Sequence, residues 1–135
     1  MIDGAFADRF ARDWIEAWNR HDLEQILAHY SDDFVMSSPR IAVVAGEPSG
    51  VLKGKSAIGA YWKKALALAP GLRFELIQTF VGADSVVLHY HGVRGPAAEA
   101  FFFGADGRVV RSSANYLQEK LEGNLEGNRD RSRAR

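Results

Sequence analysis

The spacing of apolar residues changes once along the chain, at Pro70-Gly71. Before this point, apolar residues recur every three or four positions, as they do along one face of an α-helix. From Leu72 onward, they alternate with polar residues and are rich in β-branched and aromatic types, as in half-buried strands. Helices followed by strands predict an α+β fold in which the helices cover one face of a sheet.

Three helices are expected before the change. The first ends near Asn19 and carries aromatic residues at every fourth position: Phe6, Phe10, Trp14 and Trp18. A second, short helix covers residues 23–30, with Asp22 in place to cap it. The third covers residues 56–69.

Turn signals divide the second half into four expected strands: 72–81, 85–93, 97–103 and 108–117. Their short connections favour an antiparallel meander. Residues 34–38 resemble an earlier strand, and residues 39–53 a loop with at most a little strand at 41–44. Residues 1–121 are expected to form a single domain, because the basic stretch 122–135 has almost nothing to bury and is expected to be disordered.

Composition excludes several classes of function. The 17 basic and 17 acidic residues and a sequence pI near 6.9 give no electrostatic reason to expect nucleic acid or an anionic membrane as partner. No apolar run has the roughly 20 residues of a membrane-spanning helix, and the start lacks a signal peptide, so a cytoplasmic location is expected. The absence of cysteine excludes a thiolate nucleophile, and we expect no metal or cofactor.

Glu99 is the one charged residue of an otherwise apolar expected strand. If Arg94-Gly95 is a two-residue turn, Tyr90 lies opposite Glu99 and the carboxyl shares the apolar face of the sheet. Burial drives a carboxyl toward its neutral form, which makes Glu99 a candidate general acid or hydrogen-bond donor. In the alternative, Glu99 reaches solvent near the turn or pairs with Arg94.

His89 and His91 lie two residues apart, so they share one face of their strand. The same turn places them on the outer face of the sheet with Ala98, Ala100, Phe102, Arg111, Ser113 and Asn115. A surface or interface role is favoured there. Catalysis with Glu99 or Asp33 and metal binding remain alternatives, and a longer turn would bring both histidines inside.

Three stretches carry a family resemblance through their order and spacing: FARDWIEAWNRHDLEQILAHYSDDFVM, LKGKSAIGAYWKKAL and FFFGADGRVVRSSANY. Over residues 5–118 the chain resembles the nuclear transport factor 2-like superfamily, in its SnoaL-like and ketosteroid isomerase-like branch. The resemblance implies a cone-shaped roll, in which a strongly curved antiparallel or mixed sheet packs on the three helices. It also implies an apolar pocket at the open end and usually a homodimer, formed through the outer sheet face. The superfamily contains several kinds of enzyme and pure binding modules, so it fixes no activity.

The resemblance to the steroid isomerases also implies positions for a site. Trp14 falls where those enzymes have an oxyanion-hole tyrosine, and Tyr30 and Trp62 fall where they have supporting tyrosines. Ser38 falls at the proton-shuttling aspartate and Glu99 at the protonated aspartate. Because a serine cannot take a proton from carbon without an adjacent base, steroid isomerisation by the familiar route is not expected.

The sequence thus favours a pocket for a small, mostly hydrophobic carbonyl or hydroxyl compound. Any catalysis would be cofactor-independent acid–base chemistry of the isomerase, cyclase, dehydratase or hydrolase type, with Glu99 moving a proton while Trp14 and Tyr30 orient a substrate oxygen. The residues expected to contact the substrate are Trp18, Met36, Ser38, Trp62, Tyr90, Phe101, Phe103, Ser112 and Tyr116. Two alternatives stay open: a non-catalytic binding or sensing module, and a dimeric structural or interaction protein with a filled cone.

Overall fold

A computed structural model describes residues 1–118, so the expected basic tail of residues 122–135 lies outside the described residues. The elements in chain order are α1 (Gly4–Asn19), α2 (Leu23–Leu27), β1 (Tyr30–Ser37), α3 (Pro39–Val44), β2 (Val51–Lys53), α4 (Lys55–Leu68), β3 (Glu75–Val81), β4 (Ser85–Gly92), β5 (Gly95–Phe103) and β6 (Val109–Tyr116). The described part of the chain therefore has the predicted order, helices mainly first and strands mainly last.

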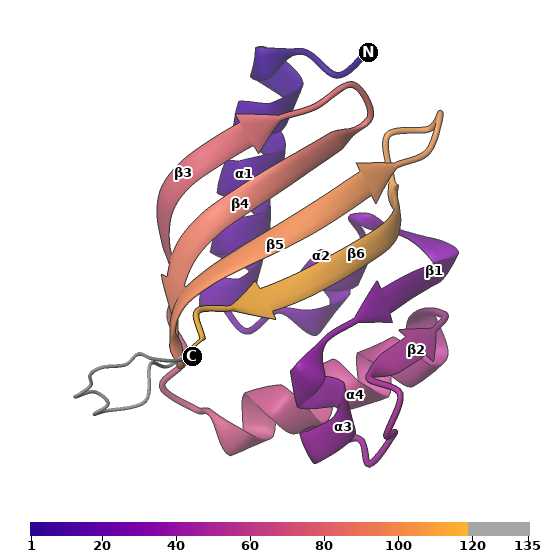
Figure 1. The fold of residues 1–135 in the computed structure, drawn as a ribbon, viewed down its shortest axis with the longest axis vertical. Helices are drawn as coiled ribbons and strands as arrows, with labels where there is room; N and C mark the ends of the chain where they lie inside the picture. The colour runs from indigo at the N-terminus through magenta and orange to yellow at the C-terminus, as the bar shows by residue number, and fades with distance from the viewer. Residues whose placement is uncertain (119–135) are drawn as a thin grey trace, which may run out of the picture.

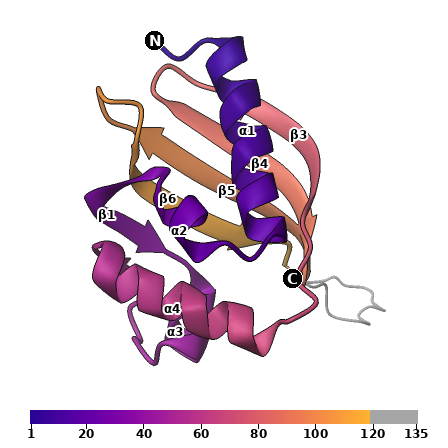
Figure 2. The same ribbon diagram turned by 180° about the vertical axis from the view of Figure 1, so that it is seen from behind.

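The strands form one curved, mixed sheet in the order β2-β1-β6-β5-β4-β3 (Figure 1). Strands β3 to β6 pair antiparallel in succession, which confirms the predicted meander, and β1 pairs parallel with β6. Seen from behind, α1 crosses the concave side of β3 to β5, while α3 and α4 lie toward the β1–β2 end (Figure 2). The predicted α+β fold class, with helices packed on one face of a curved sheet, is confirmed.

Helix α1 packs on the sheet through the predicted aromatic stripe. Phe10, Trp14 and Trp18 are buried, and the small side chains Ala7, Ala11 and Ala17 are buried beside them. The Asp3 carboxylate caps the helix by accepting a hydrogen bond from the Phe6 backbone N–H at 2.8 Å. Burial of this stripe, at roughly 25 cal/mol per Å² of apolar surface, fixes the helix on the sheet.

The extents of α2 and β1 differ from the prediction. The helix expected over residues 23–30 ends at Leu27, and the strand expected over 34–38 already begins at Tyr30. Tyr30 pairs with Val109 of β6, and the register then shifts before β1 continues. This long-range pairing outweighs the helical spacing of Tyr30 with the preceding apolar residues.

The prediction of a loop over residues 39–53 was partly wrong, because its first part is the helix α3. The Ser38 side chain caps this helix, its Oγ accepting from the Arg40 N–H at 3.1 Å, and Pro39 stands at the start of the first turn. A Ser-Pro pair marks a helix start as well as a loop. The short strand in this stretch is β2, which pairs with β1, and not residues 41–44.

The turn between β4 and β5 lies one residue earlier than predicted. Gly92 pairs with Gly95, so Val93 and Arg94 form the two-residue connection. Gly95 has a φ of +97°, a conformation that glycine adopts without steric cost. The requirement for positive φ at the end of this turn fixes its position.

This earlier turn shifts the predicted register by two residues. Leu88, and not Tyr90, lies directly opposite Glu99, while Tyr90 lies opposite Ala97. Because side chains alternate between faces, a shift of two leaves every residue on its predicted face. The predicted placement of Glu99 on the inner face is therefore confirmed, and His89, opposite Ala98, lies on the outer face.

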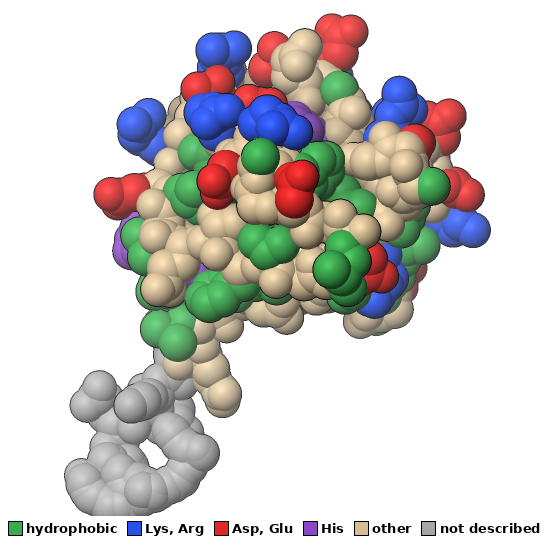
Figure 3. Space-filling model, turned by 90° about the horizontal axis from the view of Figure 1, so that it is seen from above, with side chains coloured by type: hydrophobic (Ala, Val, Ile, Leu, Met, Phe, Trp, Pro, Cys, Tyr) green, Lys and Arg blue, Asp and Glu red, His purple; other side chains and the backbone are tan. Residues whose placement is uncertain are grey.

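The face at the N-terminal end of the molecule carries no single dominant charge. Seen from the end that bears the N-terminus, basic and acidic side chains are interspersed (Figure 3). Among the helices within residues 1–118, none has both the length and the apolar character that crossing a bilayer requires.

The residues expected at a dimer interface lie together on the outer sheet face. Phe102 pairs across the strands with Arg111, whose guanidinium carbon is 4.1 Å from the Phe102 ring centroid. The His89 Nδ1–H donates a hydrogen bond to the Gln78 Oε1 at 3.3 Å, and the Asn115 side chain donates to the Ala98 carbonyl at 3.0 Å. Dimerisation through this face remains a prediction.

We expect Phe102→Asp to convert a dimer into a monomer, because it places a charge in the centre of the proposed contact. Sedimentation equilibrium of the full chain measures the mass. Val43→Asp, at an exposed position on α3, is the control and should leave the mass unchanged. A monomeric wild type, or a dimeric Phe102→Asp variant, contradicts the prediction.

Candidate functional site

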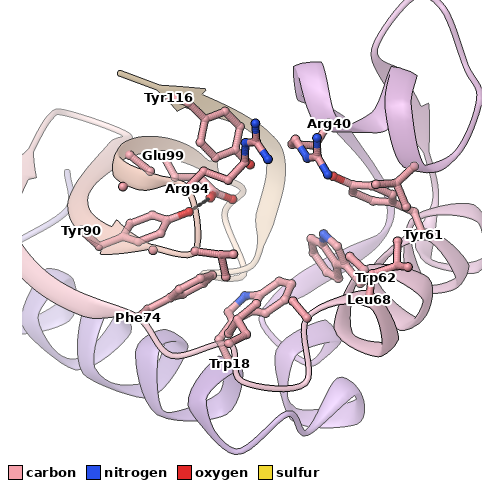
Figure 4. A pocket seen from close by; sticks show the side chains of 18 of the residues that line it. Trp18, Arg40, Tyr61, Trp62, Leu68, Phe74, Tyr90, Arg94, Glu99 and Tyr116 are labelled. Carbon is pink, nitrogen blue, oxygen red and sulfur yellow. Dashed lines mark hydrogen bonds between the residues drawn. The ribbon is translucent and has the colours of Figure 1, made fainter. Parts of the chain in front are cut away.

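A cavity of about 320 Å³ lies where the open end of the sheet faces α3 and the C-terminal half of α4. Three kinds of wall enclose it (Figure 4). The sheet side consists mainly of Tyr90, Ala97, Glu99 and Tyr116. The opposite side consists mainly of Met36 from β1 and of side chains from α3 and α4: Arg40, Val44, Tyr61, Trp62, Ala65 and Leu68. Trp14, Trp18 and Phe74 form an aromatic wall between them.

Phe74, which the sequence did not single out, is held in the wall by its backbone. The Asn19 side chain donates to the Phe74 carbonyl at 3.0 Å and accepts from the Phe74 N–H at 2.6 Å. The His21 ring hydrogen-bonds the Leu72 carbonyl at 2.9 Å. Side chains at the end of α1 thus hydrogen-bond the backbone of the segment before β3. The Phe74 ring stacks on Trp14 with centroids 5.6 Å apart.

Glu99 is the one carboxyl among the described residues that line the cavity. Its side chain is only 4 % exposed, and the Tyr90 hydroxyl donates to its Oε1 at 2.8 Å. Desolvation raises the pKa of Glu99 to about 7, against the opposing effect of the Tyr90 hydrogen bond. Within residues 1–118 it forms no ion pair, so the alternative in which it reaches solvent or pairs with Arg94 is wrong.

The buried carboxyl lowers stability at neutral pH. Its pKa is higher in the folded protein than its ordinary value of 4.5, so the folded state binds this proton more tightly than the unfolded state. This pH-dependent cost is absent below about pH 4.5, grows between pH 4.5 and about 7, and is constant above that, at on the order of 3 kcal/mol. A destabilising group of this kind, inside a cavity, is typical of a functional site.

Two phenols border the cavity beside Glu99. Burial raises the pKa of Tyr61, and it raises the pKa of Tyr116 to about 12, where the negative charge of Glu99 adds to the effect. Hydrogen bonding by Ser38 lowers the pKa of both tyrosines, only partly offsetting burial. Both hydroxyls are therefore neutral near pH 7 and can donate hydrogen bonds to a ligand oxygen.

Trp14 and Tyr30 are hydrogen-bonded to each other. The Trp14 Nε1–H donates to the Tyr30 hydroxyl at 2.9 Å, and both side chains are fully buried. Burial also raises the pKa of Tyr30 well above its ordinary value of 10.0. The N–H expected to orient a substrate is thus occupied inside the protein, and Trp14 contributes its ring to the cavity wall.

The other expected contact residues divide into two groups. Those in the cavity wall are Trp18, Met36, Trp62, Tyr90 and Tyr116. Ser38 caps α3, whereas Phe101, Phe103 and Ser112 belong to the packed core. The core is solid at the narrow end of the cone because Phe10 packs edge-on against both Phe101 and Phe103, at 4.9 and 5.0 Å between centroids.

The residues that sequence analysis missed are Phe74, Tyr61, Arg40 and Arg94. Tyr61 shares the apolar face of α4 with Trp62, so its helical spacing was a usable signal. Phe74 is placed in the site by its contact with Asn19, and Arg40 by helix α3, which was not predicted. Arg94 is placed there by the turn between β4 and β5, which lies one residue earlier than predicted. The structure groups no three histidine or acidic side chains of residues 1–118 in a way that could hold a metal ion.

The curved sheet, the helices on its concave face and the apolar cavity with one buried acid define a cone-shaped pocket domain of the α+β class. The family model for a SnoaL-like domain matches residues 11–112, so the chain belongs to the SnoaL-like family.

Solved structures agree with this assignment. A SnoaL-like protein of unknown function from Burkholderia thailandensis is 55% identical, with a TM-score of 0.83 over 87% of this chain and 98% of that one. A proposed polyketide cyclase from Sinorhizobium meliloti is 17% identical, with a TM-score of 0.65 over 79% of this chain and 94% of that one. A proposed isomerase of the SnoaL-like family from Agrobacterium tumefaciens is 16% identical, with a TM-score of 0.65 over 82% and 96% of the two chains. The last two show the fold alone, and no curated protein matches the chain.

We expect Tyr30→Phe to lower the free energy of unfolding by about 1–3 kcal/mol, because it leaves the buried Trp14 N–H without its acceptor. Urea denaturation measures the change. Tyr61→Phe is the control, with a smaller expected loss because the Tyr61 hydroxyl borders the cavity. Equal stability of Tyr30→Phe and the wild type would show that this hydrogen bond does not form.

Proposed function

We propose that the chain binds a small, mostly apolar carbonyl or hydroxyl compound in this cavity, and that Glu99 exchanges a proton with it. The observation that carries the proposal is a single carboxyl, buried in a wall that is otherwise mainly aromatic and aliphatic, and hydrogen-bonded to Tyr90. An apolar cavity with a few convergent polar groups and one perturbed titratable residue is the usual arrangement of a small-molecule site.

The chemistry follows from the pKa of Glu99. A carboxyl that titrates near pH 7 is present in both forms at neutral pH, so it can accept a proton from a carbon beside a carbonyl and return it. In this proposal the neutral hydroxyls of Tyr61 and Tyr116, which line the same cavity, donate to the oxygen on which negative charge develops. Tyr90 is a positioning residue, because its hydroxyl holds the Glu99 carboxyl in place.

The names of two structural relatives, a proposed isomerase and a proposed polyketide cyclase, are compatible with chemistry of this class. They support the proposal only through the shared fold, since the identities are 16% and 17%.

A non-catalytic binding module is the second candidate. It is favoured by the cavity wall itself, in which no described residue besides Glu99 carries a carboxyl or an imidazole. If the protein is a catalyst, Glu99 or water must also return the proton to the substrate, because no second carboxyl or imidazole lines the cavity within residues 1–118. Binding and proton transfer therefore have to be measured separately.

The test uses 2-tetralone, a two-ring ketone with acidic C1 protons. Glu99 in its ionised form would remove a C1 proton, leave an enolate, and allow a deuteron from D₂O to replace it; proton NMR follows the loss of the C1 signal. We expect the rate to rise with pH through about 7, as Glu99 ionises. Glu99→Gln should slow the exchange about 100-fold or more.

The matched control is Glu24→Gln, at an exposed position in the first turn of α2, which should exchange at the wild-type rate. Calorimetry gives the binding of 2-tetralone to each protein. Binding without enhanced exchange would select the non-catalytic module, and the absence of both would remove the proposed function.

A further inference from the structure

Two arginines frame the mouth of the cavity. Arg40, half-buried, comes from α3, and Arg94, exposed, comes from the turn between β4 and β5. In Figure 4 their guanidinium groups point toward one another from opposite sides of the opening. The mouth is therefore positively charged, whereas the walls behind it are mainly aromatic and aliphatic.

No side chain among residues 1–118 forms an ion pair with either guanidinium. Within residues 1–118 the ion pairs are Arg20 with Glu16 and Lys55 with Asp32, both at the surface. Two like charges that face each other repel, and a guanidinium presents donors in a fork that matches a carboxylate. An anion between the two groups would remove the repulsion and use donors that are otherwise left to water.

The backbone fixes both arginines at this position. The Arg40 N–H is bound by the Ser38 side chain in the first turn of α3, at 3.1 Å. Arg94 stands in a two-residue turn that is closed by Gly95 at positive φ. These anchors lie on opposite sides of the cavity and come from segments far apart in the sequence.

We propose that the ligand is an apolar monocarboxylate whose carboxylate group lies between Arg40 and Arg94. Its apolar body would lie against the rings of Trp18, Trp62 and Phe74. This inference rests on the proposed function and adds the class of ligand to it.

The distribution of charge also sets the orientation of the ligand. Ionised Glu99, inside the cavity, repels a carboxylate, while the arginine pair at the mouth attracts it. The acid group therefore faces outward, and a carbonyl or hydroxyl elsewhere on the apolar body is presented to Glu99. A keto or hydroxy derivative of an apolar acid satisfies both ends of the site.

The test compares 2-naphthylacetate with 2-naphthylacetamide, which share shape and differ in charge. Calorimetry on the full chain gives both dissociation constants. We expect the acid to bind at least about tenfold more tightly than the amide, as charge-assisted hydrogen bonds predict. Arg40→Gln and Arg94→Gln should each reduce this preference, and the double variant should abolish it while the amide binds as before.

The matched control is Arg9→Gln with Arg12→Gln, which removes the same charge from exposed positions on α1 and should keep the preference. Equal affinity for acid and amide in the wild type, or a preference that survives in the Arg40/Arg94 double variant, overturns the inference and leaves the proposed function standing. Failure of both probes to bind overturns the inference together with the binding function on which it rests.

Discussion

Desolvation of the Glu99 carboxyl is the interaction around which the site is organised. Strand β5 carries it on the inner face of the sheet, where the neighbouring side chains are apolar except for Tyr90 of β4 and Ser112 and Tyr116 of β6. Full exposure would return the group to an ordinary acid, and an ion pair would hold it ionised. In this fold Glu99 is neither exposed nor ion-paired within residues 1–118. Its pKa is therefore about 7, so that it can both accept and donate a proton at neutral pH.

A set of braced aromatic rings forms the wall beside this carboxyl. Trp18 packs edge-on against Trp62 at 5.4 Å, and Phe74 packs against Tyr90 at 4.6 Å between ring centroids. The Asn19 side chain of α1 hydrogen-bonds the Phe74 backbone. This contact holds the Phe74 ring in position between α1 and the sheet. The narrow end of the cone has no comparable space, because Phe10 fills it against β5. The same kind of residue therefore builds a solid core at one end and a cavity wall at the other.

Local patterns in the sequence predicted the elements and the faces, and missed what depends on distant contacts. Alternation placed Glu99 on the inner face even though the turn was misplaced, because an error of two residues preserves the face. Residues 39–53 were predicted to form a loop after a strand ending at Ser38, so helix α3 and the position of Arg40 beside the cavity were not predicted. The pairing of Trp14 with Tyr30, sixteen residues away, could not follow from either helical or strand spacing. The family resemblance predicted the overall cone and, together with the apolar strand around it, a role for Glu99 in the site. The position of Arg40 and Arg94 at the mouth of the cavity is known only from the structure.

The most direct measurement is the titration of the Glu99 side-chain carboxyl by carbon NMR, with the signal assigned by its loss in Glu99→Gln. We predict a midpoint near pH 7, because the carboxyl is buried in a mainly apolar cavity and forms no ion pair within residues 1–118. A midpoint near the ordinary 4.5 would mean that water or a positive charge reaches the group, and the central claim would be wrong.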